Sequence, residues 1–213
     1  MRLAAAILVI ISALGAPALA RQQIPEETML KMRQVFTDVR DDLWLINDDF
    51  WHRGQLNRCI GTMRVLTSID PHSTEAYENT AWLMYSDLRE HDAEAFLREG
   101  LANNIDVYDL YLELGTFCYF RMRYPEAIDL YTGCVTFEDA PKYARRQLAH
   151  ALEKNGDIGE ALEMWLQIEA SDQDYAVPEI QIDRILQGGE PSMVPEMTSH
   201  SIETRHRERH QQK

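Results

Sequence analysis

Hydrophobic positions in the middle of the chain recur with a period of 34 residues. One column of positions is small, a second column four residues later is large and apolar, and a third column twelve residues before the first is mostly small. The three columns are Cys59, Ala93, Ala127 and Ala161; Met63, Leu97, Tyr131 and Trp165; and Asn47, Ala81, Gly115 and Ala149. Such a period is typical of one repeated supersecondary unit. It predicts four units, at residues 40–73, 74–107, 108–141 and 142–175.

Each unit is predicted to form two helices joined by a short turn. In the third unit, Leu114 and Cys118 belong to an apolar run at helical spacing that ends at residues 123–125, and a second run begins at Ala127. Antiparallel helices approach closely where one offers Ala or Gly to a bulky side chain of the other. Because neither helix buries its apolar face alone, neighbouring units are expected to stack on one another.

These columns and their local motifs resemble the tetratricopeptide repeat family. The motifs are Leu114-Gly115, Ala127-Ile128 with Tyr131, and Ala161-Leu162 with Trp165. The resemblance covers residues 40–175 and extends to exported bacterial members of the family. It implies an all-α fold, a right-handed α-solenoid of stacked helix-turn-helix repeats. The second unit departs from the family pattern, because Leu88-Arg89-Glu90 stands at its inter-helix turn, where the first and last units carry Gly54 and Gly156.

Further helices are predicted on both sides of the repeats. Residues 21–39 carry apolar side chains at helical spacing, so an N-terminal capping helix is expected. No Gly or Pro separates this segment from the first unit, and one helix from about Glu26 to His52 is compatible with the sequence. Residues 176–189 are expected to form a C-terminal capping helix, and the polar residues 190–213 a disordered tail.

Residues 1–20 have the pattern of a secretory signal peptide. Arg2 precedes an apolar run that reaches Leu14, and the segment ends in Ala18-Leu19-Ala20. The alternative is an uncleaved membrane anchor. The apolar run has about 12 residues, fewer than the roughly 20 that a membrane-spanning helix needs. We therefore expect an exported protein with a periplasmic or extracellular location.

The charge and composition of the chain narrow the class of partner. The 213 residues include 21 Lys and Arg against 35 Asp and Glu, a formal net charge of −14. Such a chain has no basic field with which to displace counterions from nucleic acid, so a nucleic-acid partner is not expected. With 45% hydrophobic residues, the composition is that of a globular protein. The cysteines Cys59, Cys118 and Cys134 lie in apolar helical runs, so we expect reduced, buried thiols.

No motif for catalysis, metal binding or cofactor binding stands out. The chain contains no HExxH, no GxSxG and no phosphate-binding loop. Asp48 and His52 share one helix face and could bind a metal, but a solvated helix end is the favoured interpretation. The tail histidines His200, His206 and His210 are likewise interpreted as solvated side chains. We therefore expect a non-enzymatic protein without a cofactor or a bound metal.

The concave side of the solenoid is the candidate binding surface. The resemblance implies that the first helices of the units line a groove that holds an extended or helical peptide. Aromatic rings beside carboxylates suit a partner with apolar and basic side chains. Individual rings can instead pack against the preceding helix, an alternative that applies above all to Trp44 and Tyr119. The predicted groove residues are Trp44, Asp48, Trp51, Glu75, Glu78, Trp82, Tyr85, Asp109, Leu112, Tyr119, Tyr143, Arg146 and His150.

Together these patterns predict an exported adaptor or assembly scaffold that binds another protein or a peptide. Two alternatives stay open at this point. In the first, identical chains stack through their end helices or grooves and form a structural homo-oligomer. In the second, the protein binds a metal or acts as an enzyme through Asp48 and His52.

Overall fold

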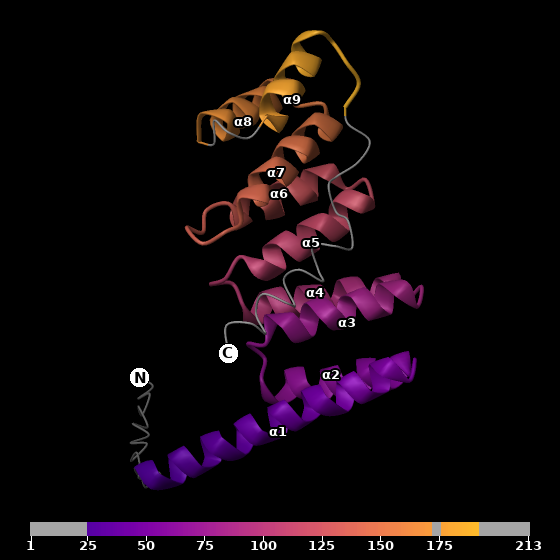
Figure 1. Ribbon diagram of the computed structural model, residues 1–213, viewed down its shortest axis with the longest axis vertical. Helices are drawn as coiled ribbons and strands as arrows, with labels where there is room; N and C mark the ends of the chain where they lie inside the picture. Colours follow the sequence, from indigo (N-terminus) through magenta and orange to yellow (C-terminus); the bar gives the residue numbers. More distant parts are fainter. Residues whose placement is uncertain (1–24, 172–175, 192–213) are drawn as a thin grey trace, which may run out of the picture. The chain divides into compact units, whose positions relative to one another are not determined.

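The computed structural model describes residues 25–171 and 176–191, and in these residues the chain forms nine α-helices and no strand (Figure 1). Three segments lie outside the described residues: residues 1–24, which include the predicted signal peptide at residues 1–20; residues 172–175, at the end of the fourth repeat; and residues 192–213, most of the predicted tail. The chain divides into two compact units, residues 1–39 and residues 40–213. Among the described helices, none is both long enough and apolar enough to cross a lipid bilayer.

The helices follow the predicted pairs. They are α1 (Glu26–His52), α2 (Leu56–Ile69), α3 (Thr74–Ser86), α4 (Glu90–Asn103), α5 (Asp109–Phe120), α6 (Tyr124–Cys134), α7 (Lys142–Asn155), α8 (Ile158–Ser171) and α9 (Val177–Leu186). From α2 to α9 each helix contacts the next along the chain, and α5 also contacts both α3 and α7. The helices α3, α5 and α7 therefore form one layer, with α4 and α6 behind it in Figure 1. The predicted all-α fold of stacked helix-turn-helix units is confirmed.

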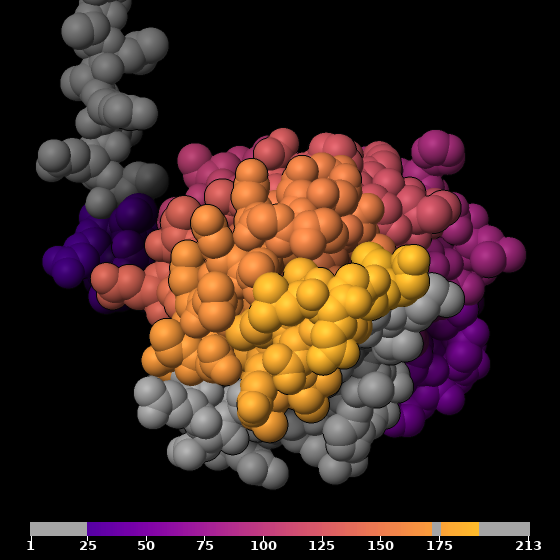
Figure 2. Space-filling view, turned by 90° about the horizontal axis from the view of Figure 1, so that it is seen from above, coloured from indigo at the N-terminus to yellow at the C-terminus, as the bar shows by residue number. Residues whose placement is uncertain are grey.

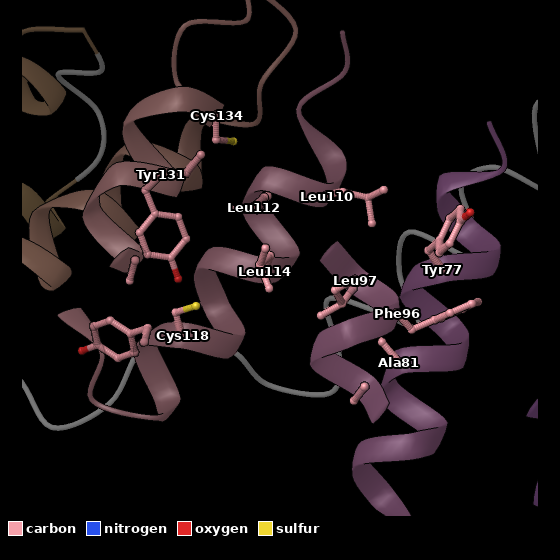
Figure 3. Packing of buried hydrophobic residues seen from close by; sticks show 14 of the residues in the cluster. Tyr77, Ala81, Phe96, Leu97, Leu110, Leu112, Leu114, Cys118, Tyr131 and Cys134 are labelled. Atoms are coloured by element: carbon pink, nitrogen blue, oxygen red, sulfur yellow. The ribbon is translucent and has the colours of Figure 1, made fainter. Parts of the chain in front are cut away.

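Small residues let the two helices of a unit approach closely. Gly115 of α5 lies against the ring of Tyr131 of α6, and a Cβ atom added at Gly115 would come within 2.8 Å of that ring. Figure 3 shows the ring of Tyr131 directed from α6 toward α5. The Tyr131 hydroxyl donates a hydrogen bond to Thr116 Oγ1 over 3.1 Å, which satisfies the buried phenol. The small and large columns of the sequence thus meet face to face in the core.

The turn between the two helices of each repeat contains a residue in the left-handed backbone region. These residues lie 34 positions apart, and they are Gly54 (φ 66°), Leu88 (φ 61°), Met122 (φ 57°) and Gly156 (φ 94°). Glycine adopts this region readily, whereas an L-residue with a Cβ atom is strained there by about 1–2 kcal/mol. The two middle turns keep the geometry of the outer ones despite this strain.

A buried carboxylate connects the last three helices. Glu153 of α7 has a side chain only 1% exposed. Its Oε1 accepts a hydrogen bond of 2.8 Å from the indole nitrogen of Trp165 in α8, and its Oε2 forms an ion pair with Arg184 of α9. Figure 2 views this end of the chain, where α9, in yellow, lies across the orange helices. One side chain therefore positions the fourth helix pair and the helix that follows it.

We predict that the variant Leu88→Gly is more stable than the natural chain by roughly 0.5–1 kcal/mol, because glycine removes the left-handed strain. Leu88 is 86% exposed, so little burial is lost with its side chain. Urea unfolding measures the difference. The reverse change, Gly156→Leu, is the matched control and should lower the free energy of unfolding. Equal stability of the Leu88→Gly variant and the natural chain would show that the Leu88 turn is not strained.

The second stability prediction concerns Glu153. The variant Glu153→Ala leaves the Arg184 charge and the Trp165 indole N–H without their buried partner, and we expect a loss of about 3 kcal/mol. Glu163→Ala is the matched control, because Glu163 is exposed on α8 and its replacement should change stability by less than about 0.5 kcal/mol. Thermal unfolding followed by circular dichroism compares the two variants. Similar losses in both would rule out the structural role of the Glu153 carboxylate.

Candidate binding face on the first helices of the repeats

The side chains of α3 show how one helix face combines two kinds of group. Glu75, Glu78, Trp82 and Tyr85 are spaced by three, four and three residues, so they share one face of the helix. Trp82 and Tyr85 are each 45% exposed, and the two glutamates are partly buried. The opposite face of α3, which includes Tyr77, is buried in the core. The exposed face therefore has carboxylates in its first half and aromatic rings in its second half.

The same order of groups extends to the neighbouring helices. We call Glu75, Glu78 and Asp109 the acidic row, and Trp51, Trp82, Tyr85, Phe117 and Phe120 the aromatic row. The carboxylates lie in the first two turns of α3 and α5, and the rings lie in the last two turns of α1, α3 and α5. Seven residues separate Glu75 from Trp82, which corresponds to about 10 Å along a helix axis.

Ring contacts make the aromatic row continuous from one unit to the next. The ring centroids of Trp51 and Trp82 are 5.7 Å apart, and those of Tyr85 and Phe117 are 6.3 Å apart in an edge-to-face arrangement. The guanidinium carbon of Arg121 lies 4.8 Å from the Phe117 centroid and 5.6 Å from that of Tyr85. The same guanidinium group forms an ion pair with Glu90. Ring contacts thus join neighbouring units at two places along the aromatic row.

Negative charge is concentrated on the layer of first helices in the second and third units. The helices α3 and α5 contain the carboxylates Glu75, Glu78, Asp109 and Glu113 and no Lys, Arg or His. The charged side chains of these two helices are therefore all negative.

On the second helices, several carboxylates form ion pairs with arginines of the same chain. Glu94 of α4 forms ion pairs of 2.7 Å with Arg98 and 2.9 Å with Arg123, and Arg98 also pairs with Glu126. Burial by itself raises the pKa of Glu94, but the hydrogen bonds from Arg123 and Arg98 outweigh this effect and hold that pKa below its usual value. The charges of α4 and α6 therefore contribute to the cohesion of the stack.

The predicted groove residues fall into three classes of burial. Asp48, Trp51, Trp82 and Tyr85 are exposed. Those that are partly buried are Trp44, Glu75, Glu78, Asp109, Tyr143 and Arg146. Those that are buried are Leu112, Tyr119 and His150. The structure therefore brings the acidic and aromatic residues of the first three units to the surface and leaves three predicted contacts inside.

The three buried residues pack in the protein interior. Leu112 and Tyr119 belong to the main hydrophobic cluster, and burial raises the pKa of Tyr119 to about 12. The ring of His150 packs edge-on against Trp165, with 5.0 Å between ring centroids. These three side chains therefore contribute to packing, and their role in binding stays a prediction. Trp44 also packs, against a cluster that contains Met63, as the alternative interpretation of this residue expects.

Three residues of the aromatic surface, Phe117, Phe120 and Arg121, are absent from the list of predicted groove residues. Phe117 directly precedes Cys118 and follows Tyr85 by 32 residues, a spacing close to that of other contacts between neighbouring units. Arg121 directly follows the last residue of α5, outside the helical periodicity. A search for aromatic pairs and for oppositely charged pairs about 31 residues apart would have found Phe117 and Arg121. Phe117 follows Tyr85 by 32 positions, and Arg121 follows Glu90 by 31.

Asp48 and His52 have the geometry of a solvated helix end. His52 Nδ1 lies 2.8 Å from the Asp48 carbonyl oxygen and 3.3 Å from Asp48 Oδ2. Both side chains are more than two-thirds exposed. Within residues 25–171 and 176–191, no group of three or more His, Cys, Asp or Glu side chains is placed so that it could hold a metal ion.

Comparison with solved structures identifies similar folds. PilF of Pseudomonas aeruginosa has a TM-score of 0.58 and 17% identity, covering 72% of this chain and 70% of its own. MamA has a TM-score of 0.59 and 15% identity, covering 71% of this chain and 83% of its own. YrrB, described as a TPR protein with an unusual peptide-binding site, has a TM-score of 0.56 and 16% identity, covering 72% and 82%.

At identities this low, the similarity concerns the fold alone. No protein-family model matches the sequence, and a comparison with curated proteins gives no match.

The contact between Trp51 and Trp82 yields a prediction about stability. Because Trp82 is 45% exposed, the variant Trp82→Ala should lose only about 1–2 kcal/mol and stay folded. A double-mutant cycle with Trp51→Ala should show a coupling energy of about 0.5–1.5 kcal/mol between the two rings. Urea unfolding of the four proteins measures the coupling. A coupling near zero would mean that the two rings do not stabilise one another.

Proposed function

The chain has the fold of tetratricopeptide repeat proteins, and on this basis we propose that it is a non-enzymatic adaptor or assembly scaffold that binds another protein. The proposed binding surface consists of the acidic row and the aromatic row together. The peptide-binding site named for YrrB supports a protein or peptide as the ligand of this fold. The partner segment is proposed to carry apolar and basic side chains.

The observation that carries this proposal is the exposure of two large rings beside carboxylates on α3. Trp82 and Tyr85 are each nearly half exposed, whereas Tyr77 and Tyr131, the large rings at the small core positions, are buried. Exposed apolar area that is contiguous between neighbouring units is typical of an interaction site. Burial of the remaining ring surface by a partner would supply the affinity, since aromatic residues dominate binding energies at interfaces.

The acidic row is proposed to select and orient the partner. Charges at the rim of an interface mainly raise the association rate and disfavour partners of like charge. A segment with Lys or Arg along one edge and apolar side chains along the other would match both rows at once. An amphipathic helix is about 10–12 Å across, comparable with the separation along α3 between its carboxylates and its rings.

We further propose that this binding takes place after export, in the periplasm or outside the cell. The N-terminal signal pattern of residues 1–20 supports this location. The proposed partner is therefore a protein of the cell envelope or a protein outside the cell.

The proposed function predicts the outcome of a pull-down from the native envelope fraction. The bait is residues 21–213, beside a variant of the same bait with Trp82→Ala and Glu78→Lys. A specific partner should be enriched by the natural bait and lost with the variant, because the change removes one ring and reverses one charge of the face. Quantitative mass spectrometry of the two eluates measures the difference.

The matched control for this experiment is the bait with Glu99→Lys, a charge reversal at an exposed position of α4 on the other layer. It should recover the same partner as the natural bait. Recovery of an identical set of proteins by all three baits would show that the face is not the binding surface. Recovery of this chain alone would favour the homo-oligomer instead.

A further inference from the structure

The C-terminal ten residues differ in charge from the rest of the chain. Residues 204–213 carry Arg205, Arg207, Arg209 and Lys213 against the single carboxylate of Glu208, a net charge of +3. The other 203 residues carry 17 basic and 34 acidic side chains, a net charge of −17. We propose that residues 204–213 bind the acidic row of their own chain and occupy part of the partner-binding face when no partner is present.

The charges of the first helices match the order of charges along the tail. The helix α7 carries four Lys and Arg side chains against Glu153 alone, whereas α5 and α3 carry only carboxylates. Residues 192–203 contain Glu196 and Glu203 and no Lys or Arg. A tail that passes α7 first and reaches α5 and α3 with its last ten residues therefore brings opposite charges together along its whole length.

The length of the tail is sufficient for this path. The last described residue, Pro191, follows α9, and α9 is joined to α7 by the ion pair between Arg184 and Glu153. Because α7 contacts α5 and α5 contacts α3, three steps between packed helices, each about 8–10 Å, lead from α9 to α3. The 13 residues from Pro191 to Thr204 span up to about 45 Å when extended.

The acidic row also offers a suitable place for closely spaced arginines. Glu78 and Asp109 lie 31 residues apart in α3 and α5, the spacing that joins Trp51 to Trp82 and Glu90 to Arg121. Both are partly buried and lie on helices that contact one another. Arginine is the side chain best suited to recognise carboxylates, because its guanidinium group presents several donors in a fixed plane.

Covalent attachment makes a weak interaction effective. A short flexible connection gives a tethered segment an effective concentration in the millimolar range. A free peptide with a dissociation constant near 100 µM would then be excluded about tenfold by the attached tail. A partner with basic side chains would have to displace the tail, and only a segment that also engages the aromatic row would do so efficiently. This inference rests on the proposed function in that both use the acidic row.

The test uses a fluorescein-labelled peptide of residues 204–213 and measures its anisotropy with four proteins. The proteins are the full chain, the chain ending at Glu203, the shortened chain with Glu78→Lys, and the shortened chain with Glu99→Lys as the control. We expect binding to the shortened chain at least tenfold tighter than to the full chain. The Glu78→Lys change should abolish it, and the Glu99→Lys change should leave it unchanged. A peptide in which Arg205, Arg207 and Arg209 are replaced by Ser should not bind.

Equal affinity for the full and shortened chains would overturn the inference, and so would the absence of binding to the shortened chain. The pull-down, repeated with the shortened chain as bait, separates this result from the proposed function. A partner that depends on Trp82 and is recovered equally by both chains would support the proposed function and contradict the tail inference. Tight peptide binding without any partner lost on changing Trp82 would do the reverse.

Discussion

The close approach of two helices within each unit is the constraint on which the structure depends. At Gly115 and Gly100 an added Cβ atom would lie 2.8 Å and 2.6 Å from the rings of Tyr131 and Tyr77, respectively. Atoms cannot be accommodated at such distances without a shift of the backbone or the ring. The large rings are buried only because the facing helix offers no side chain there. The hydrophobic core therefore depends on glycine, which has no side chain, at these two positions as much as on the bulky residues that pack against them.

The contacts between units give the binding face its form. Trp51 with Trp82, Glu90 with Arg121 and Glu153 with Arg184 each join residues 31 positions apart. This spacing is one repeat less three residues, so a side chain meets the next unit about one helical turn before its own equivalent position. On the surface the spacing aligns rings into a row, and in the interior it aligns an acid with a base. The ion pairs that join the units and the ring contact on the surface thus share one spacing.

Much of the fold could be predicted from the sequence, because the same pattern of small and large positions recurs four times with a period of 34 residues. The helix pairs, the facing of Gly115 by Tyr131 and the exposure of Trp82 all follow from that period. The left-handed backbone of Leu88 and Met122 is not marked by their own residue type, and only their register with Gly54 and Gly156 points to it.

The depth of burial of single residues was the least predictable part of the site. Tyr119 occupies the helix position equivalent to the exposed Trp51 and Tyr85, and only its neighbours in space place it in the core. Leu112 is likewise buried although its equivalents Glu78 and Arg146 are only partly buried. The position of Arg121 over two rings likewise depends on a unit 31 residues earlier in the chain. Sequence periodicity assigns a residue to a face, whereas packing between layers decides how much of that face solvent reaches.

The spacing of 31 residues also restricts how the length of such a chain can change in evolution. Insertion or loss of a whole 34-residue unit preserves every local partner relation, since each unit meets only the units next to it. A single residue inserted into a helix would rotate the later positions of that helix by about 100° and separate its side chains from their partners in the next unit. Lineages descended from this chain should therefore differ by complete units, and the acidic–aromatic face would become longer or shorter without changing its pattern.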